Sequence, residues 1–263
     1  MSSSTGLPHE VLDLIIDHLH TEPATLKSCT LVSKSWVPRT RKHLFDRVEF
    51  DSEYGPFLES WMKAFPDPST SPAHHTRLLA FRTYPVISAK ATAIIAHLRS
   101  FRHITRLEMI TSGWNDHRLS FVPLHGLSPT LKSLSLHYEL VPLSEILNLI
   151  CSFPLLEDLA LSHYGLYGHT GWRDIPSTSP KLSGTLALDS EHPSITRGLL
   201  SLPNGLHFSK ITLLRSVEDA ELTMEVVSEC SDTLESLNIR YSHWRAFSSV
   251  SAAGHHLTFV WYR

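Results

Sequence analysis

The stretch Leu131-Lys132-Ser133-Leu134-Ser135-Leu136 decides the fold, because variants of its spacing recur along the chain. Each copy has an apolar-x-apolar triplet, whose first residue we call the anchor. The anchors are Leu107, Leu134, Leu159, Leu186, Ile211 and Leu237. Successive anchors are 27, 25, 27, 25 and 26 residues apart. Because a strand alternates its side chains between two faces, each triplet predicts a short strand with apolar residues facing a core.

Weaker copies of the triplet precede the clear ones, at Val48-Glu49-Phe50 and Leu79-Ala80-Phe81. Apolar residues at helical spacing in 94–98 and 143–150 predict helices between the strands. A period of 25–27 residues with this pattern resembles the leucine-rich repeat. The resemblance implies an α/β solenoid, with strands on a concave side and helices outside. A generic α/β layer fold is the alternative.

The repeats depart from the leucine-rich-repeat pattern three residues after the last strand leucine, where that family carries Asn or Cys. The residues at this position are Ser112, Glu139, Tyr164, Glu191, Ser216 and Ser242. No buried asparagine ladder can form, so we expect an irregular solenoid. Residues 255–263 look like one more strand with no polar cap after it. We expect an edge strand that closes the sheet, or a repeat domain truncated at its C-terminus.

The first fifty residues carry a different pattern, that of three short helices. In 7–19, apolar residues recur every three or four positions, and Pro8 suits the first helical position. A second helix is predicted over 24–32 and a third over 33–45. Three helices in about 40 residues cannot bury much core alone, so this unit needs a partner or an adjoining domain.

Four stretches of this region together resemble an F-box: Leu7-Pro8-His9-Glu10-Val11-Leu12, Ile15-Ile16-Asp17-His18-Leu19, Cys29-Thr30-Leu31-Val32-Ser33-Lys34-Ser35-Trp36 and Arg41-Lys42-His43-Leu44-Phe45. The resemblance covers roughly residues 6–46, and this segment has no important departure from the family's pattern. It implies a set of helices that docks on the Skp1 adaptor of a cullin–RING ubiquitin ligase. The residues that it assigns to this contact are Leu7, Pro8, Val11, Leu12, Ile15, Leu31, Val32, Trp36 and Leu44. The alternative is that these side chains pack only against the rest of the chain.

Trp and Tyr residues gather shortly after the expected strands and in the long loop 163–172. In a solenoid such segments share one rim, and Trp and Tyr dominate binding hot spots. We therefore expect a protein substrate to bind there. The candidates are Trp114, Tyr138, Tyr164, Tyr167, Trp172, Tyr241 and Trp244. An equally open alternative is that these aromatic side chains fill the rim of the core.

Composition excludes several classes of function. The 263-residue chain has a net charge of −3, whereas a general nucleic-acid binder needs a concentrated basic face. No apolar run reaches the roughly 18 residues of a membrane span, and the first residues lack the features of a signal peptide. Three cysteines, Cys29, Cys151 and Cys230, suit buried free thiols in a reducing compartment. We expect localisation in the cytoplasm or nucleus.

No motif for bond chemistry is present in the sequence. The chain lacks a Gly-rich phosphate loop, a nucleophile elbow, an H-E-x-x-H helix and a C-x-x-C pair. Its 18 histidines include pairs such as His74-His75, but histidines at this density are usually solvated. We expect no catalytic residue, no metal and no cofactor, so the protein is not expected to be an enzyme.

The expected organisation is a disordered tail (1–6), an F-box (7–46) and a leucine-rich-repeat-like solenoid (47–263). The expected function is a substrate-recognition adaptor of a Skp1–cullin–F-box ubiquitin ligase. One alternative is a non-ligase repeat scaffold whose F-box-like helices only cap the solenoid. Another is a ligand-sensing adaptor with a small molecule under the aromatic rim. Exposure of the apolar residues in 7–19 separates the ligase adaptor from the scaffold, because a docking surface must be exposed in the free chain.

Overall fold

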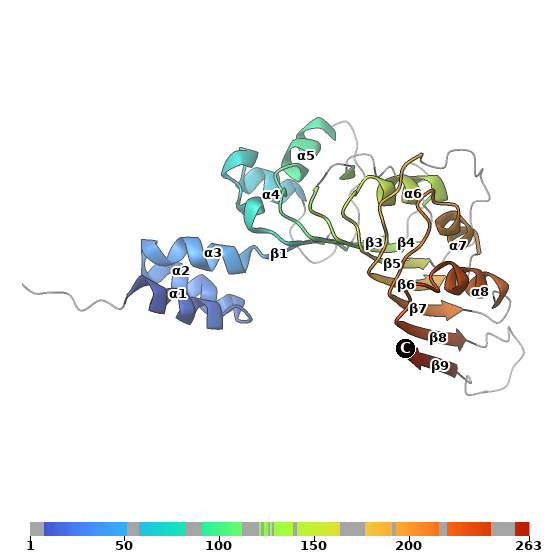
Figure 1. Ribbon diagram of the computed structural model, residues 1–263. Coiled ribbons are helices and arrows are strands. Elements are labelled where there is room, and N and C mark those ends of the chain that lie inside the picture. Colours follow the sequence, from blue (N-terminus) through green and yellow to red (C-terminus); the bar gives the residue numbers. More distant parts are fainter. Residues whose placement is uncertain are drawn as a thin grey trace, which may run out of the picture.

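A computed structural model describes most of the chain. The described residues are 8–51, 58–82, 91–111, 121, 124, 125, 127, 129–138, 141–163, 177–190, 193–215, 220–242 and 256–262. They form a lobe of three helices that leads through a short strand into a curved sheet with a layer of helices on one side (Figure 1).

The sheet contains nine strands among the described residues, and their order in space is their order in the sequence. The strands are β1 (Arg47–Phe50), β2 (Leu78–Phe81), β3 (Arg106–Thr111), β4 (Ser133–Tyr138), β5 (Asp158–His163), β6 (Thr185–Ser190), β7 (Lys210–Arg215), β8 (Ser236–Ser242) and β9 (His256–Tyr262). Strands β1 to β8 pair in parallel, whereas β9 is antiparallel to β8. Each added strand therefore extends the sheet by one repeat, which is the arrangement of a solenoid.

The register of the sheet follows the anchors of the sequence. Leu134 pairs with Leu107 on one side and with Leu159 on the other, and the row continues to Leu237 through β6 and β7. The weaker copies join the same row, because Val48 pairs with Leu79 and Leu79 with Leu107. Along β4, buried and half-buried side chains alternate. The prediction of one strand per repeat, with apolar side chains on the core face, is confirmed for these strands.

The helices between the strands cover one face of the sheet (Figure 1). They are α4 (Leu58–Ala64), α5 (Ala91–Leu98), α6 (Leu143–Cys151), α7 (Pro193–Leu200) and α8 (Ala220–Glu229). In α6, Ile146, Leu147, Leu149 and Ile150 are buried, so this helix turns its apolar stripe toward the strands. The buried strand and helix residues form one continuous core that begins at Val48.

Hydrogen bonds between neighbouring repeats hold the starts of β2, β3, β4, β5, β7 and β8 in place. The carbonyl oxygen of Thr105 accepts the N–H groups of both Lys132 and Ser133, each at 2.9 Å. The carbonyl oxygens at 46, 77, 132, 184 and 209 accept two such N–H groups in the same way. The hydroxyl groups of Thr130 and Thr233 donate to main-chain oxygens of the preceding repeat. These contacts satisfy backbone polar groups at the strand starts, in a fold whose sequence offers no asparagine ladder.

The N-terminal lobe contains α1 (His9–His18), α2 (Pro23–Val32), the 3-10 turn η1 (Lys34–Trp36) and α3 (Val37–Leu44). Pro8 is the residue before α1 and not its first residue, and Pro38 lies in the first turn of α3. The third expected helix is divided, because Ser33 is extended and its hydroxyl accepts the N–H of Ser35 at the start of η1. The three predicted helices are confirmed with these changes of boundary.

The last described strand, β9, forms the edge of the sheet beyond β8. Its antiparallel direction ends the run of parallel repeats, and all seven of its residues pair with β8. The expected edge strand is therefore confirmed.

Candidate functional site

The three N-terminal helices have a small core of their own. Ile16 of α1, Leu26 and Cys29 of α2 and Thr40 of α3 are buried, while the core of the solenoid begins only at Val48. The hydroxyl of Thr40 donates to main-chain oxygens of its own helix turn, so its burial leaves no unpaired polar group. A core of this size uses few of the apolar side chains that the helices carry.

Five large apolar side chains of α1 and α2 are exposed to solvent. Leu31 is 88% exposed and Val32 is 67% exposed, at the C-terminal end of α2. On α1, Leu14 is 60% exposed, and Val11 and Ile15 are exposed to a lesser extent. Only two other large apolar side chains in the described part of the chain are exposed to this degree, Leu155 and Met224 of the solenoid. Exposed apolar surface is therefore concentrated on the two helices, as in a surface that binds a partner.

The expected Skp1-contact residues divide by exposure. Pro8, Val11, Ile15, Leu31 and Val32 are exposed, whereas Leu12, Trp36 and Leu44 are half-buried, and Leu7 lies outside the described residues. The turn η1, which contains Trp36, contacts α1, α2 and α3 and so connects the helices of the lobe.

Sequence reasoning missed Leu14, which is more exposed than Val11 or Ile15. A signal was present, because Leu14 lies three residues after Val11 and therefore on a neighbouring position of the helix surface. Ile16, which the resemblance does not assign to the contact, is buried. We define the docking surface as Val11, Leu14, Ile15, Leu31 and Val32.

A polar cluster on α1 and α3 holds these helices together. The Asp17 carboxylate accepts hydrogen bonds from Arg39 Nε at 2.6 Å and from His43 Nε2 at 2.7 Å, and also pairs with Arg39 Nη2. These bonds, that from Arg39 first, hold the pKa of Asp17 far below its usual value. The cluster fixes the angle between α1 and α3, and with it the direction in which α1 presents its apolar residues.

We expect Asp17→Asn to lower the stability of the three-helix lobe by about 1 kcal/mol at neutral pH, because the cluster is partly exposed to water. The folded-state pKa of Asp17 is depressed, so its contribution is complete above the ordinary value of 3.8 and is lost as the pH falls below it. Hydrogen exchange of the α1 amides at pH 7 measures the difference, with exposed Asp13→Asn as the control. Equal exchange in both variants would contradict this role of Asp17.

The lobe joins the solenoid through α3. This helix contacts the 3-10 turn η3 (Pro72–His75), and the carbonyl oxygen of Asp46 accepts the N–H groups of Arg77 and Leu78 at 2.8 and 3.0 Å. The first strand, β1, follows α3 directly and pairs with β2. The attachment thus uses α3 and leaves the exposed side chains of α1 and α2 without a described partner.

The expected substrate rim is corrected at Tyr138. This residue ends β4 and is only 2% exposed, within the solenoid core. Burial raises the pKa of its phenol far above the usual value. Tyr138 is therefore a core residue and not a surface for a protein substrate. Trp114, Tyr164, Tyr167, Trp172 and Trp244 lie outside the described residues, and Tyr241 lies in β8 with its side chain outside the described part.

Charged side chains of β1, of β3 and of the residue that follows β2 pair with one another. Arg82 Nε lies 2.6 Å from Glu49 Oε1, and Arg106 Nε lies 3.0 Å from Glu108 Oε1. Arg47 lies between the two carboxylates, 3.2 Å from Glu49 and 3.7 Å from Glu108. The hydrogen bond from Arg82 is the main reason why the pKa of Glu49 is lowered. This part of the sheet surface has alternating charges and no single sign.

The cysteines have no features of nucleophiles. All three are free thiols; Cys29 and Cys230 are buried, and Cys151 is half-buried. Burial raises the pKa of Cys151 to about 11 and is also the main cause of a raised pKa at Cys230. These two thiols are therefore protonated at neutral pH, and a protonated thiol is a poor nucleophile. The prediction of free, buried thiols is confirmed for Cys29 and Cys230.

Within the described part of the chain, no three His, Cys, Asp or Glu side chains are grouped so that they could hold a metal ion. Among the described helices, none has the length and apolar character needed to cross a membrane. Comparison of the chain with protein-family models and with characterised proteins gives no match.

Proposed function

We propose that this protein is the substrate-recognition adaptor of a Skp1–cullin–F-box ubiquitin ligase. The observation that carries the proposal is the docking surface on α1 and α2, where Leu31 is 88% exposed and Val32 67% exposed. Large apolar side chains with this exposure are unfavourable in water, and burial against a partner stabilises them by about 25 cal/mol per Å². The same side chains, Leu14 apart, occupy positions at which the sequence resembles an F-box.

The proposal assigns separate tasks to the two parts of the chain. The helices α1, α2 and α3 bind the Skp1-type adaptor and, through it, a cullin–RING ligase. The solenoid captures a protein substrate and holds it near the ligase, so that selectivity comes from proximity and orientation. The chain itself performs no bond chemistry, and its localisation in the cytoplasm or nucleus follows from this role.

A repeat scaffold whose first helices only cap the solenoid is the second candidate. The observation in its favour is the attachment of α3, which contacts η3 and leads into the edge strand β1. A cap, however, presents a polar outer surface to solvent. The docking surface is apolar, and this difference favours the adaptor.

Mixing the full chain with a purified Skp1-type adaptor tests the proposal. Size-exclusion chromatography with light scattering is expected to show a 1:1 complex at micromolar concentrations. Circular dichroism of the free chain provides the control for folding. A folded chain that elutes separately from the adaptor would overturn the proposal and leave the scaffold.

A further inference from the structure

The outer edge of β9 is one end of the sheet, and no described strand pairs with it (Figure 1). On its other side, all seven residues from His256 to Tyr262 pair with β8 in an unbroken register. In an antiparallel ladder, alternate residues direct both their N–H and their C=O groups away from the neighbouring strand. The backbone groups that β9 directs away from β8 can therefore pair with a further strand.

The two ends of the sheet differ in the features that prevent such pairing. The strand at the first end, β1, has only four residues, and two of them, Arg47 and Glu49, are charged. Native edge strands are protected by short length, charged side chains, proline or bulges. The sequence of β9 is longer, at seven residues, and contains no Lys, Arg, Asp, Glu or Pro. Its register with β8 has no bulge, so none of these protections is present in β9.

Alternate positions of β9 continue the core face of the sheet. Trp261 pairs with the last anchor, Leu237, which packs against the core, and Phe259 pairs with Ile239, which is buried. Positions 257, 259 and 261 therefore share the face of these two residues. In the described part of the chain, no helix follows β8 to cover them. A strand with the same alternation, paired with β9, would give these apolar positions apolar neighbours.

A second copy of this chain offers such a strand. Antiparallel pairing of β9 with itself, centred on Phe259, places Leu257 opposite Trp261 of the partner subunit. It also places Thr258 opposite Val260 of the partner subunit, so apolar positions meet apolar positions and no acid or base is brought to the contact. This pairing has two-fold symmetry and closes after two copies. Pairing of β9 with β1 of another copy would leave an open series and would place β9 beside a charged strand.

We propose that this chain forms a two-fold dimer by antiparallel pairing of β9 with the β9 of a second copy. The two sheets then join into one, and the three-helix lobes lie at its far ends, because β1 is the opposite end of each sheet. Since pairing of one strand buries less area than a standard interface, we expect association at about 10–100 μM. The proposal does not rest on the adaptor function, because the docking surface lies on α1 and α2.

The variant Thr258→Glu/Val260→Glu is designed to block this pairing while keeping the contact of β9 with β8. Within one chain, Thr258 pairs with Arg240 and Val260 with Asn238, so a glutamate at position 258 meets an opposite charge. Between two copies, the glutamates at 258 and 260 lie directly opposite one another, and like charges in such pairs are destabilising. Thr258→Gln/Val260→Gln is the matched control, because its side chains have the same length and no charge.

Sedimentation equilibrium of the full chain up to about 200 μM tests the dimer. We expect a monomer–dimer equilibrium for wild type, a similar one for the glutamine variant, and at least tenfold weaker association for the glutamate variant. Circular dichroism confirms that each variant is folded. The proposal is overturned if wild type stays monomeric, if it forms an open series of species larger than a dimer, or if the glutamate and glutamine variants associate within twofold of each other.

Discussion

Replacing Leu31 with aspartate is expected to weaken binding to a Skp1-type adaptor at least about 100-fold, or about 2.7 kcal/mol. Leu31 is 88% exposed in the free chain, so the substitution removes little packing and the lobe stays folded. In the complex, the same position requires a carboxylate to leave water for an apolar surface, which is strongly unfavourable. The expected loss therefore appears in binding and not in stability.

Leu155→Asp is the matched control for this experiment. Leu155 is also a large exposed side chain, at 52%, but it lies after α6 in the solenoid. Calorimetric titration of the adaptor with wild type and both variants should give a large loss for Leu31→Asp alone. Equal affinities of the two variants would mean that α2 takes no part in the contact.

Truncating Leu134 to alanine is expected to lower the free energy of unfolding by about 2–5 kcal/mol. Leu134 is fully buried and lies between Leu107 and Leu159 in the central row of anchors. Removing its side chain leaves a cavity at the contact of three repeats, where the neighbouring strands restrict relaxation. In a solenoid, this contact also transmits stability from one repeat to the next.

Ser135→Ala is the matched control, because Ser135 is the next residue of β4 and points to the opposite face of the sheet. Urea unfolding followed by circular dichroism measures both variants. The serine variant should remain within about 0.5 kcal/mol of wild type. A loss below about 1 kcal/mol for Leu134→Ala would contradict the assignment of the anchors to a continuous core.

The repeat architecture was predictable because it depends on local spacing. Anchors 25–27 residues apart predicted strands that pair in the same register, and Val48 and Leu79 extend the row as expected. The direction of β9 was not predictable in this way. A strand pattern specifies which residues alternate, whereas parallel or antiparallel pairing depends on the path of the connection.

The error at Tyr138 has a physical cause that the sequence already contained. Tyr138 lies two residues after Leu136 and four after Leu134, so all three side chains share one face of β4. The prediction that Tyr138 lies in the loop after the strand ends the alternation of buried side chains one position too early. Strand boundaries are set by hydrogen bonds to neighbouring strands, which an apolar pattern alone does not reveal.

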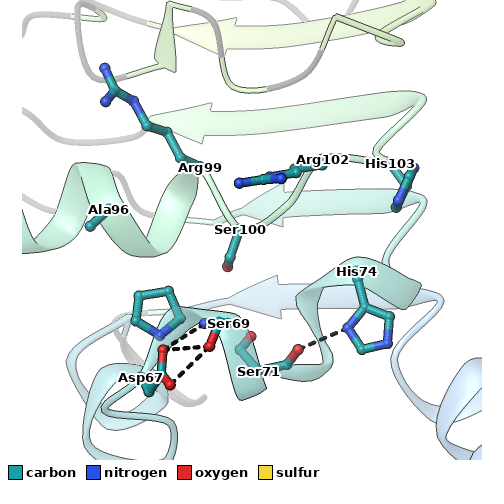
Figure 2. Close-up of a pocket in the computed structure, with 10 residues that line it drawn as sticks. Asp67, Ser69, Ser71, His74, Ala96, Arg99, Ser100, Arg102 and His103 are labelled. Carbon is teal, nitrogen blue, oxygen red and sulfur yellow. Dashed lines mark hydrogen bonds between the residues drawn. The ribbon is translucent and has the colours of Figure 1, made fainter.

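Two cavities, lined by residues of α3, of the segment 67–77 and of the connection between α5 and β3, could not be predicted from local pattern. Figure 2 shows the larger of the two. Lys42, His74 and Arg102 are distant in sequence, and only the pairing of β1, β2 and β3 brings their segments together. The docking surface was predictable in part, because helical spacing identifies the apolar positions of α1. Which of these positions face the small internal core depends on packing, as the burial of Ile16 beside exposed Ile15 illustrates.

Hydrogen–deuterium exchange of the free chain and of its complex with a Skp1-type adaptor tests the central claim most directly. Amides of α1 (His9–His18) and α2 (Pro23–Val32) are expected to exchange at least tenfold more slowly in the complex, while those of β3 to β8 are unchanged. Unchanged exchange in both helices, or slower exchange in the strands instead, would contradict the claim that these helices form the docking surface.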